Sequence, residues 1–140
     1  MKYYQIKRLL EDYPDAHYYM VIGERSNGKT YSALQYALER YFKTGEQFAY
    51  VRRWGEDIRR KNLSQLFAAH VENGEVSKLS TKKWDDITYT GSKFRLTKLS
   101  VDDKGKEKLE TSEDVIGHAF DLNSMEHYKS ISFPRVTTII

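Results

Sequence analysis

Eight consecutive residues of this chain have the types and the spacing of a phosphate-binding loop. Residues 23–30 read Gly-Glu-Arg-Ser-Asn-Gly-Lys-Thr and match the pattern Gly-x-x-x-x-Gly-Lys-Thr in full. Gly23 and Gly28 allow the backbone to curl, so that successive N–H groups point inward at phosphate oxygens. Lys29 is expected to reach the β- and γ-phosphates, and the Thr30 hydroxyl is expected to bind Mg²⁺. The motif therefore predicts a site for the triphosphate of ATP or GTP.

The elements on both sides of the loop support this prediction. Residues 18–22 form a short apolar run, which predicts a buried strand that leads into the loop. After the loop, the spacing predicts an amphipathic helix that ends near Gly45, with its apolar face formed by Leu34, Ala37, Leu38, Tyr41 and Phe42. Residues 47–51 predict a second strand. Strand, helix and strand in this order form one βαβ unit with parallel strands. The alternative explanation of the motif is a surface turn that caps a helix and contains glycines by chance.

The whole chain is predicted to be an α/β P-loop NTPase core with an antiparallel β insertion. Residues 1–17 form an N-terminal helical segment, and residues 18–83 form a βαβα nucleotide-binding core whose second helix spans about residues 56–71 and buries Leu63, Leu66 and Phe67. Residues 84–122 are expected to form the antiparallel insertion, with strands at 87–89, 94–101 and 115–122 and turns at 91–92 and 103–105. Residues 123–140 are the lead-in and the third core strand, which is expected to be buried.

Composition sets broad limits on the function. The chain has 140 residues, which is enough for one domain at most. It has no cysteine, so disulfides, zinc–thiolate sites and thiol nucleophiles are excluded. The four histidines share no metal-ligand spacing. No apolar run approaches the ~20 residues that cross a bilayer, and we expect a cytoplasmic protein without membrane contact. The net charge of +3 permits contact with a nucleic-acid backbone but does not require it.

Hydrolysis of the nucleotide also needs an acidic residue at the end of a further apolar strand, where it holds the magnesium shell. Residues 115–121 end in Asp121, but Gly117 and His118 interrupt the apolar run. Residues 136–140 form a better candidate strand, and its acidic end would lie just after Ile140. We therefore expect the chain to be cut before this acidic motif (Walker B), and we expect little or no turnover by this fragment alone.

Three segments of the chain resemble the DNA-packaging ATPases of tailed bacteriophages, which are terminase large subunits and encapsidation proteins. Residues 19–31 and 45–53 look like the phosphate loop and second strand of that family, and residues 129–140 are similar to the segment before its Phe-Asp-Glu-Phe motif. The resemblance implies an ATPase that uses ATP and Mg²⁺ to move double-stranded DNA into a procapsid. It also implies a homo-oligomeric ring that works with the phage portal in the host cytoplasm.

The resemblance also implies roles for single residues. Arg25 stands where terminases often carry a loop arginine, so it joins Lys29 as a candidate catalytic residue that senses the γ-phosphate. The alternative for Arg25 is a solvated loop cation. Tyr31 ends the matching loop segment and completes the predicted nucleotide contacts, which are Gly23, Glu24, Arg25, Ser26, Asn27, Gly28, Lys29, Thr30 and Tyr31. Arg52 and Arg53 match strand-end arginines that couple the nucleotide site to its neighbours, although a charged strand terminus explains them equally well.

Two questions stay open at the level of the sequence. A basic cluster is suited to DNA phosphates, but it is also typical of a solvated helix face with Glu56 and Asp57 as partners; it consists of Arg52, Arg53, Arg59, Arg60 and Lys61. The second question is the class of protein. The alternatives to a packaging ATPase are another P-loop NTPase, such as a nucleotide kinase or a replication-type ATPase, and a non-catalytic prophage remnant. A kinase would need an arginine-rich lid, which the sequence does not show.

Overall fold

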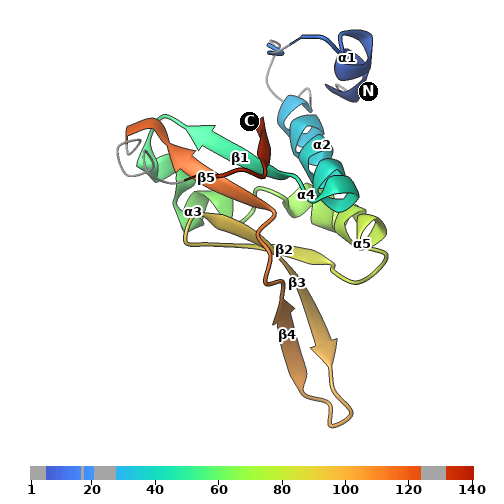
Figure 1. Ribbon diagram of the computed structural model, residues 1–140. Helices are drawn as coiled ribbons and strands as arrows, with labels where there is room; N and C mark the ends of the chain where they lie inside the picture. The colour runs from blue at the N-terminus through green and yellow to red at the C-terminus, as the bar shows by residue number, and fades with distance from the viewer. Residues whose placement is uncertain (1–5, 17, 21–27, 124–131) are drawn as a thin grey trace.

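The computed structural model describes residues 6–16, 18–20, 28–123 and 132–140, and these residues build a mixed α/β structure around one sheet (Figure 1). The strands lie in the order β2-β3-β5-β1-β6, with β4 paired to β3. The strands are β1 (Gln47–Arg52), β2 (Asp86–Thr90), β3 (Lys93–Val101), β4 (Glu107–Thr111), β5 (Gly117–Asp121) and β6 (Val136–Ile139). The helical elements are α1 (Ile6–Asp12), α2 (Lys29–Thr44), the 3₁₀-helix η1 (Gly55–Ile58), α3 (Arg60–Leu63), α4 (Ala68–Glu72) and α5 (Glu75–Leu79).

Helix α2 confirms the amphipathic helix that the spacing predicts. Leu34, Ala37 and Leu38 on its apolar face are buried, and the helix ends where expected. Gly45 follows it with φ of 77°, and the Gly45 N–H donates to the Tyr41 carbonyl over 2.8 Å. This left-handed residue suits glycine because it lacks a Cβ. The short connection from Gly45 returns the chain directly into β1, so α2 and β1 run in opposite directions.

The predicted strand before the phosphate loop is not seen in the described residues. Tyr18, Tyr19 and Met20 adopt no regular structure, and Tyr18 and Met20 are 94% and 84% exposed. Val21 and Ile22, the rest of the predicted strand, lie outside the described residues. The parallel neighbours of β1 are instead β5 and β6, which come much later in the chain. The parallel neighbours of β1 therefore come from segments far away in the sequence and not from the apolar run at residues 18–22.

Strand β5 confirms the strand predicted over residues 115–122, but its place in the sheet differs from the prediction. It pairs in antiparallel fashion with β3 and in parallel with β1, so it belongs to the core of the sheet as well as to the insertion. Gly117 is required here because a Cβ atom would lie 2.4 Å from the Phe48 ring. His118 is 9% exposed, and its Nε2 lies 3.3 Å from the Gln47 Oε1 atom. The glycine and histidine that interrupt the apolar run therefore do not keep this strand out of the core.

The single helix predicted over residues 56–71 was wrong, because the chain breaks it into η1, α3 and α4. Side chains replace helical backbone partners at the first break. The Tyr89 hydroxyl donates to the Ile58 carbonyl, and the Asn62 amide donates to the Glu56 carbonyl over 2.5 Å. Leu63 and Phe67 are still buried as expected, while Leu66 is partly buried. Phe67 joins an aromatic cluster with Phe48, Phe94 and Tyr89 at the centre of the core.

In the antiparallel part of the sheet, the ribbon of β3 and β4 extends away from the helices (Figure 1). The predicted turn between β2 and β3 is confirmed, since Gly91 and Ser92 both have positive φ values of 60° and 62°. Strand β4 was not predicted, and every one of its residues is exposed, so it carries no alternating apolar pattern. Strand β6 was predicted as a buried strand, but it lies at the edge of the described sheet, where Ile139 is 75% exposed.

Among the described residues, none of the helices combines the length and the hydropathy that crossing a bilayer requires.

Candidate nucleotide-binding site

The site is built around the start of α2. Gly28 precedes this helix in the left-handed conformation, with φ of 78° and ψ of 14°. Its carbonyl accepts a hydrogen bond from the Ser32 N–H at 2.9 Å, so the helix is fully formed from its first turn. The first N–H groups of any helix lack acceptors within that helix, and the helix dipole adds positive potential at the same place. Gly28 therefore opens a helix end that is suited to an anion, with Lys29 and Thr30 as its first residues.

Part of the predicted site lies outside the described residues. These positions are Gly23, Glu24, Arg25, Ser26 and Asn27, so the curvature of the loop and the role of Arg25 stay predictions. Within the described part, Lys29 is half-buried and Thr30 is exposed in the first turn of α2. An exposed hydroxyl at this position is accessible to a magnesium ion that accompanies a nucleotide.

Tyr31, the last predicted contact, faces α4. Its ring stacks on His70 with centroids 4.0 Å apart and planes 8° apart, and its hydroxyl accepts a hydrogen bond from the Asn73 amide over 3.0 Å. A nucleotide contact from Tyr31 would therefore come from its backbone N–H. The sequence does not single out His70 or Asn73, because a histidine without ligand spacing and an isolated asparagine form no recognisable pattern.

The other predicted site residues lie at the carboxyl ends of the parallel strands. Arg52 at the end of β1 is level with Asp121 at the end of β5, and the Val51 N–H donates to the Ile140 carbonyl over 2.9 Å. Because α2 runs against β1, Gly28 lies toward this same edge of the sheet. Open α/β sheets bind ligands outside the carboxyl ends of their strands. The fold therefore brings the start of α2 and the strand-end arginines to one edge.

The two arginines are held in different ways. The Arg52 guanidinium lies 3.8 Å from the centroid of the Tyr50 ring and donates to the Val51 carbonyl over 2.7 Å. Arg53 is exposed and lies over the Trp54 ring at 4.8 Å. Stacking on an aromatic face fixes the direction of a guanidinium without neutralising its charge. Both side chains are thus available as cations at the edge of the sheet.

The rest of the basic cluster surrounds η1 on the surface. Arg59, Arg60 and Lys61 are all exposed, as are the acidic residues between them and Arg53. Within the described ranges, no ion pair joins Glu56 or Asp57 to one of these cations. The exposed cations and the two acidic residues thus lie close together on the surface around η1.

Asp121 is a buried acidic residue at the carboxyl end of β5, with 5% of its surface exposed. One of its carboxylate oxygens lies against the backbone of Gly55, where an added Cβ atom would be 3.1 Å from it. Strand β1 separates β5 from β6, the strand whose end was expected to precede the catalytic acid. In the described part of the chain, no three His, Asp or Glu side chains gather as metal ligands. The assignment of Thr30 as a magnesium ligand stays a prediction.

A polar network that the sequence did not reveal closes the opposite end of α2. Arg135 donates to both carboxylate oxygens of Asp114 over 2.8 Å and to the Gly45 carbonyl over 2.8 Å. The Tyr41 hydroxyl donates to the same carboxylate over 2.7 Å. Hydrogen bonds from Arg135 lower the pKa of Asp114 to about 2, and burial together with Asp114 raises the pKa of Tyr41 to about 12. This network fastens the C-terminal end of α2 to the start of β6.

Comparisons with known proteins assign the chain to a family. Podovirus DNA encapsidation proteins (Gp16) match residues 1–140. The DNA packaging proteins of Bacillus phage B103 and Bacillus phage phi29 are 28% and 27% identical over 125 residues, which are 86% of this chain but 30% and 29% of those proteins. The chain thus spans less than a third of the length of these relatives.

Solved structures agree with the sequence comparisons. The N-terminal domain of the DNA packaging ATPase from bacteriophage phi29 superposes with a TM-score of 0.67 at 27% identity, covering 98% of this chain and 57% of that one. The bacteriophage Phi-29 viral genome packaging motor assembly gives a TM-score of 0.64 at 27% identity, covering 99% of this chain and 34% of that one. The mixed α/β sheet, the position of α2 and the match over the whole chain lead to one conclusion. The chain belongs to the podovirus DNA encapsidation protein (Gp16) family.

Proposed function

We propose that this chain is the ATP-binding part of a motor that moves double-stranded DNA into a phage procapsid. The observation that carries the proposal is the left-handed Gly28 at the start of α2, followed at once by Lys29 and Thr30, in a chain of the encapsidation family. The family match supports packaging over a nucleotide kinase or a replication-type ATPase. ATP binds with Mg²⁺, and hydrolysis belongs to the longer protein, whose acidic motif would follow β6.

The residues have separate roles in this proposal. Backbone N–H groups of residues 23–31 cradle the phosphates, Lys29 neutralises the β- and γ-phosphates, and Thr30 binds Mg²⁺. Arg25 stabilises charge on the γ-phosphate. Arg52 and Arg53 link the nucleotide edge to neighbouring elements or to DNA. The motor works as a homo-oligomeric ring at the phage portal in the host cytoplasm. The likeness to a solved packaging motor assembly supports the assembly into a motor.

Replacing Lys29 tests the nucleotide site. Lys29→Ala should lower the affinity for a non-hydrolysable ATP analogue with Mg²⁺ by about 100-fold, because charge-assisted hydrogen bonds to phosphate are lost. The melting temperature should change by no more than about 2 °C. Isothermal titration calorimetry and thermal denaturation on the same samples measure both quantities.

Lys43→Ala is the matched control, since Lys43 is an exposed lysine in the last turn of the same helix. It should leave the affinity unchanged. Equal affinities of Lys29→Ala and the unsubstituted chain would contradict the proposed site.

A further inference from the structure

His70 is a buried residue on a short helix, and it contacts the first turn of α2. It lies in α4, it is 1% exposed, and its Nε2 atom is 3.0 Å from the Tyr31 carbonyl oxygen. A carbonyl oxygen only accepts hydrogen bonds, so Nε2 carries the proton and donates it. Among the described residues, the buried Nδ1 atom has no hydrogen-bond partner. Burial lowers the pKa of His70, which agrees with a neutral ring in this position.

Helix α4 and Asn73, the residue that directly follows it, hold both ends of Tyr31. His70 binds its backbone carbonyl and stacks on its ring, and the Asn73 amide binds its hydroxyl. Tyr31 directly follows Thr30, so its position fixes the turn that presents Lys29 and Thr30. Three separate contacts on one residue restrict translation and rotation of this turn together.

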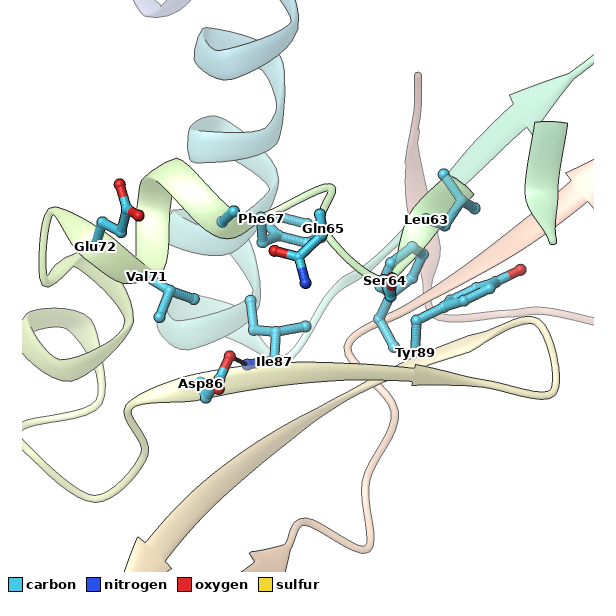
Figure 2. Close-up of a pocket in the computed structure, with 11 residues that line it drawn as sticks. Leu63, Ser64, Gln65, Phe67, Val71, Glu72, Asp86, Ile87 and Tyr89 are labelled. Atoms are coloured by element: carbon cyan, nitrogen blue, oxygen red, sulfur yellow. Dashed lines mark hydrogen bonds between the residues drawn. The ribbon is translucent and has the colours of Figure 1, made fainter. Parts of the chain in front are cut away.

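The contact between His70 and Tyr31 is linked to the hydrophobic core through Phe67, the residue before α4. The Phe67 ring meets His70 edge-on at 5.5 Å and also packs against Phe48 and Phe94. On the side of β2, α4 borders a groove of about 290 Å³ rather than a filled interface. Figure 2 shows Val71 and Ile87 on its two walls. Because this side is open, α4 is held by Phe67, by its contacts with α2 and by the neighbouring helix α5.

We propose that His70 is a positioning residue for the phosphate-binding turn, holding the first turn of α2 in register through Tyr31, with Asn73 as its helper. The inference rests on the proposed function of residues 23–31. Errors of about 1 Å in the placement of a binding group cost up to about 100-fold in an enzyme, so a hold on Tyr31 reaches the nucleotide without touching it. His70 itself contacts no nucleotide in this arrangement.

Substitutions at His70 separate positioning from general stability. His70→Phe keeps a ring on Tyr31 but removes the donor to its carbonyl. We expect about 10-fold weaker binding of a non-hydrolysable ATP analogue with Mg²⁺. Amide hydrogen exchange over residues 31–34 should become faster even without nucleotide. His70→Gln places an amide donor at a similar reach, and it should restore both the affinity and the protection to within about twofold.

Two further variants complete the test. Asn73→Ala, at an exposed position, should weaken binding by a few-fold without loss of folding. Leu63→Ala is the stability control, because Leu63 is buried on α3 and packs toward β2 rather than α2. It should lower the melting temperature but leave the nucleotide affinity within twofold.

The outcomes distinguish the two proposals. If His70→Phe and Asn73→Ala bind as tightly as the unsubstituted chain while Lys29→Ala does not bind, the positioning role is refuted and the nucleotide site stands. The positioning role is also refuted if Leu63→Ala weakens binding as much as His70→Phe, or if His70→Gln restores nothing. If the unsubstituted chain binds no nucleotide, the proposed function fails, and the positioning role fails with it.

Discussion

Some positions in this chain accept only one residue type, because a neighbouring side chain occupies the space that a larger residue would need. Gly117 lies directly under the Phe48 ring, at a distance that no side chain tolerates. The constraint is invisible in the sequence, because the two residues are far apart in the chain and a glycine inside a strand usually weakens it. Gly28 is the opposite case, since its motif predicts the requirement for a flexible backbone and the positive φ agrees with it.

Adding a methyl group at Gly117 tests the packing against Phe48. Gly117→Ala should lower the free energy of unfolding by about 1–3 kcal/mol, the usual cost of overfilling a core. Denaturant unfolding measures the change. The double variant Gly117→Ala with Phe48→Leu should recover part of the loss relative to Phe48→Leu alone, because the ring is gone. Additive effects of the two substitutions would show that the ring is not the obstacle.

Helix α2 is the element that joins the candidate site to the rest of the fold, and its two ends are held differently. At its start, α4 holds Tyr31 through aromatic stacking and neutral hydrogen bonds. At its end, Arg135 and Asp114 form a charged network around the Gly45 carbonyl. The second network connects the end of α2 to the start of β6. The two ends of α2 are therefore held by interactions of different kinds, neutral at its start and charged at its end.

The charged network predicts how stability depends on pH. The pKa of Asp114 is about 2 in the folded chain against an ordinary value of 3.8, so its contribution is fully present above about pH 4 and is lost as the pH falls toward 2. The carboxylate is partly exposed, and solvent screening limits the contribution to about 1 kcal/mol. Asp114→Asn should thus lower the melting temperature by a few degrees at pH 7 and by less at pH 2.5.

Glu113→Gln provides the charge-matched control, because Glu113 is the exposed neighbouring carboxylate. Thermal melts from pH 2.5 to pH 7 give the comparison. A difference between Asp114→Asn and the unsubstituted chain that stays constant over this range would argue against the linkage.

Elements with a strong local pattern were predictable from the sequence, and elements without one were not. The α2 helix, β1 and the Gly91-Ser92 turn follow from periodicity and turn chemistry. The helix predicted over residues 56–71 is interrupted, because side chains from elsewhere in the chain bind its backbone carbonyls. The Tyr89 hydroxyl, for example, donates to the Ile58 carbonyl. Strand β4 forms by pairing with β3 although all of its residues are exposed.

At the scale of the whole molecule, the residues of the proposed function lie toward one edge of the sheet. The carboxyl ends of β1 and β5 and the start of α2 share this edge, with exposed cations around η1 beside it. A motor that acts on DNA needs its nucleotide site close to the residues that contact DNA phosphates. The arrangement supports such a proposal without requiring base-specific contacts.

The basic cluster predicts a salt-dependent interaction with DNA. Replacing Arg59, Arg60 and Lys61 together by Gln should weaken binding to double-stranded DNA of any sequence. It should also reduce the slope of log affinity against log salt by about 2 to 3, since each phosphate contact contributes about 0.9. Fluorescence anisotropy over a salt series measures both effects.

The control removes the same charge from the β3–β4 ribbon, whose tip also carries exposed lysines. Lys104, Lys106 and Lys108 replaced together by Gln should leave the slope nearly unchanged. Equal losses from the two triple variants would mean that net charge, and not the cluster around η1, governs the interaction.

The sequence by itself determined the phosphate-binding motif, the helix that follows it and the strand β1, because these depend on contacts between residues close in the chain. It also pointed to the encapsidation family, to which the chain belongs. The tertiary structure alone decided that β5 enters the sheet beside β1, that Asp114 meets Arg135, and that His70 holds Tyr31. These contacts join residues from different elements, and their energies arise from packing and desolvation, which no local pattern records.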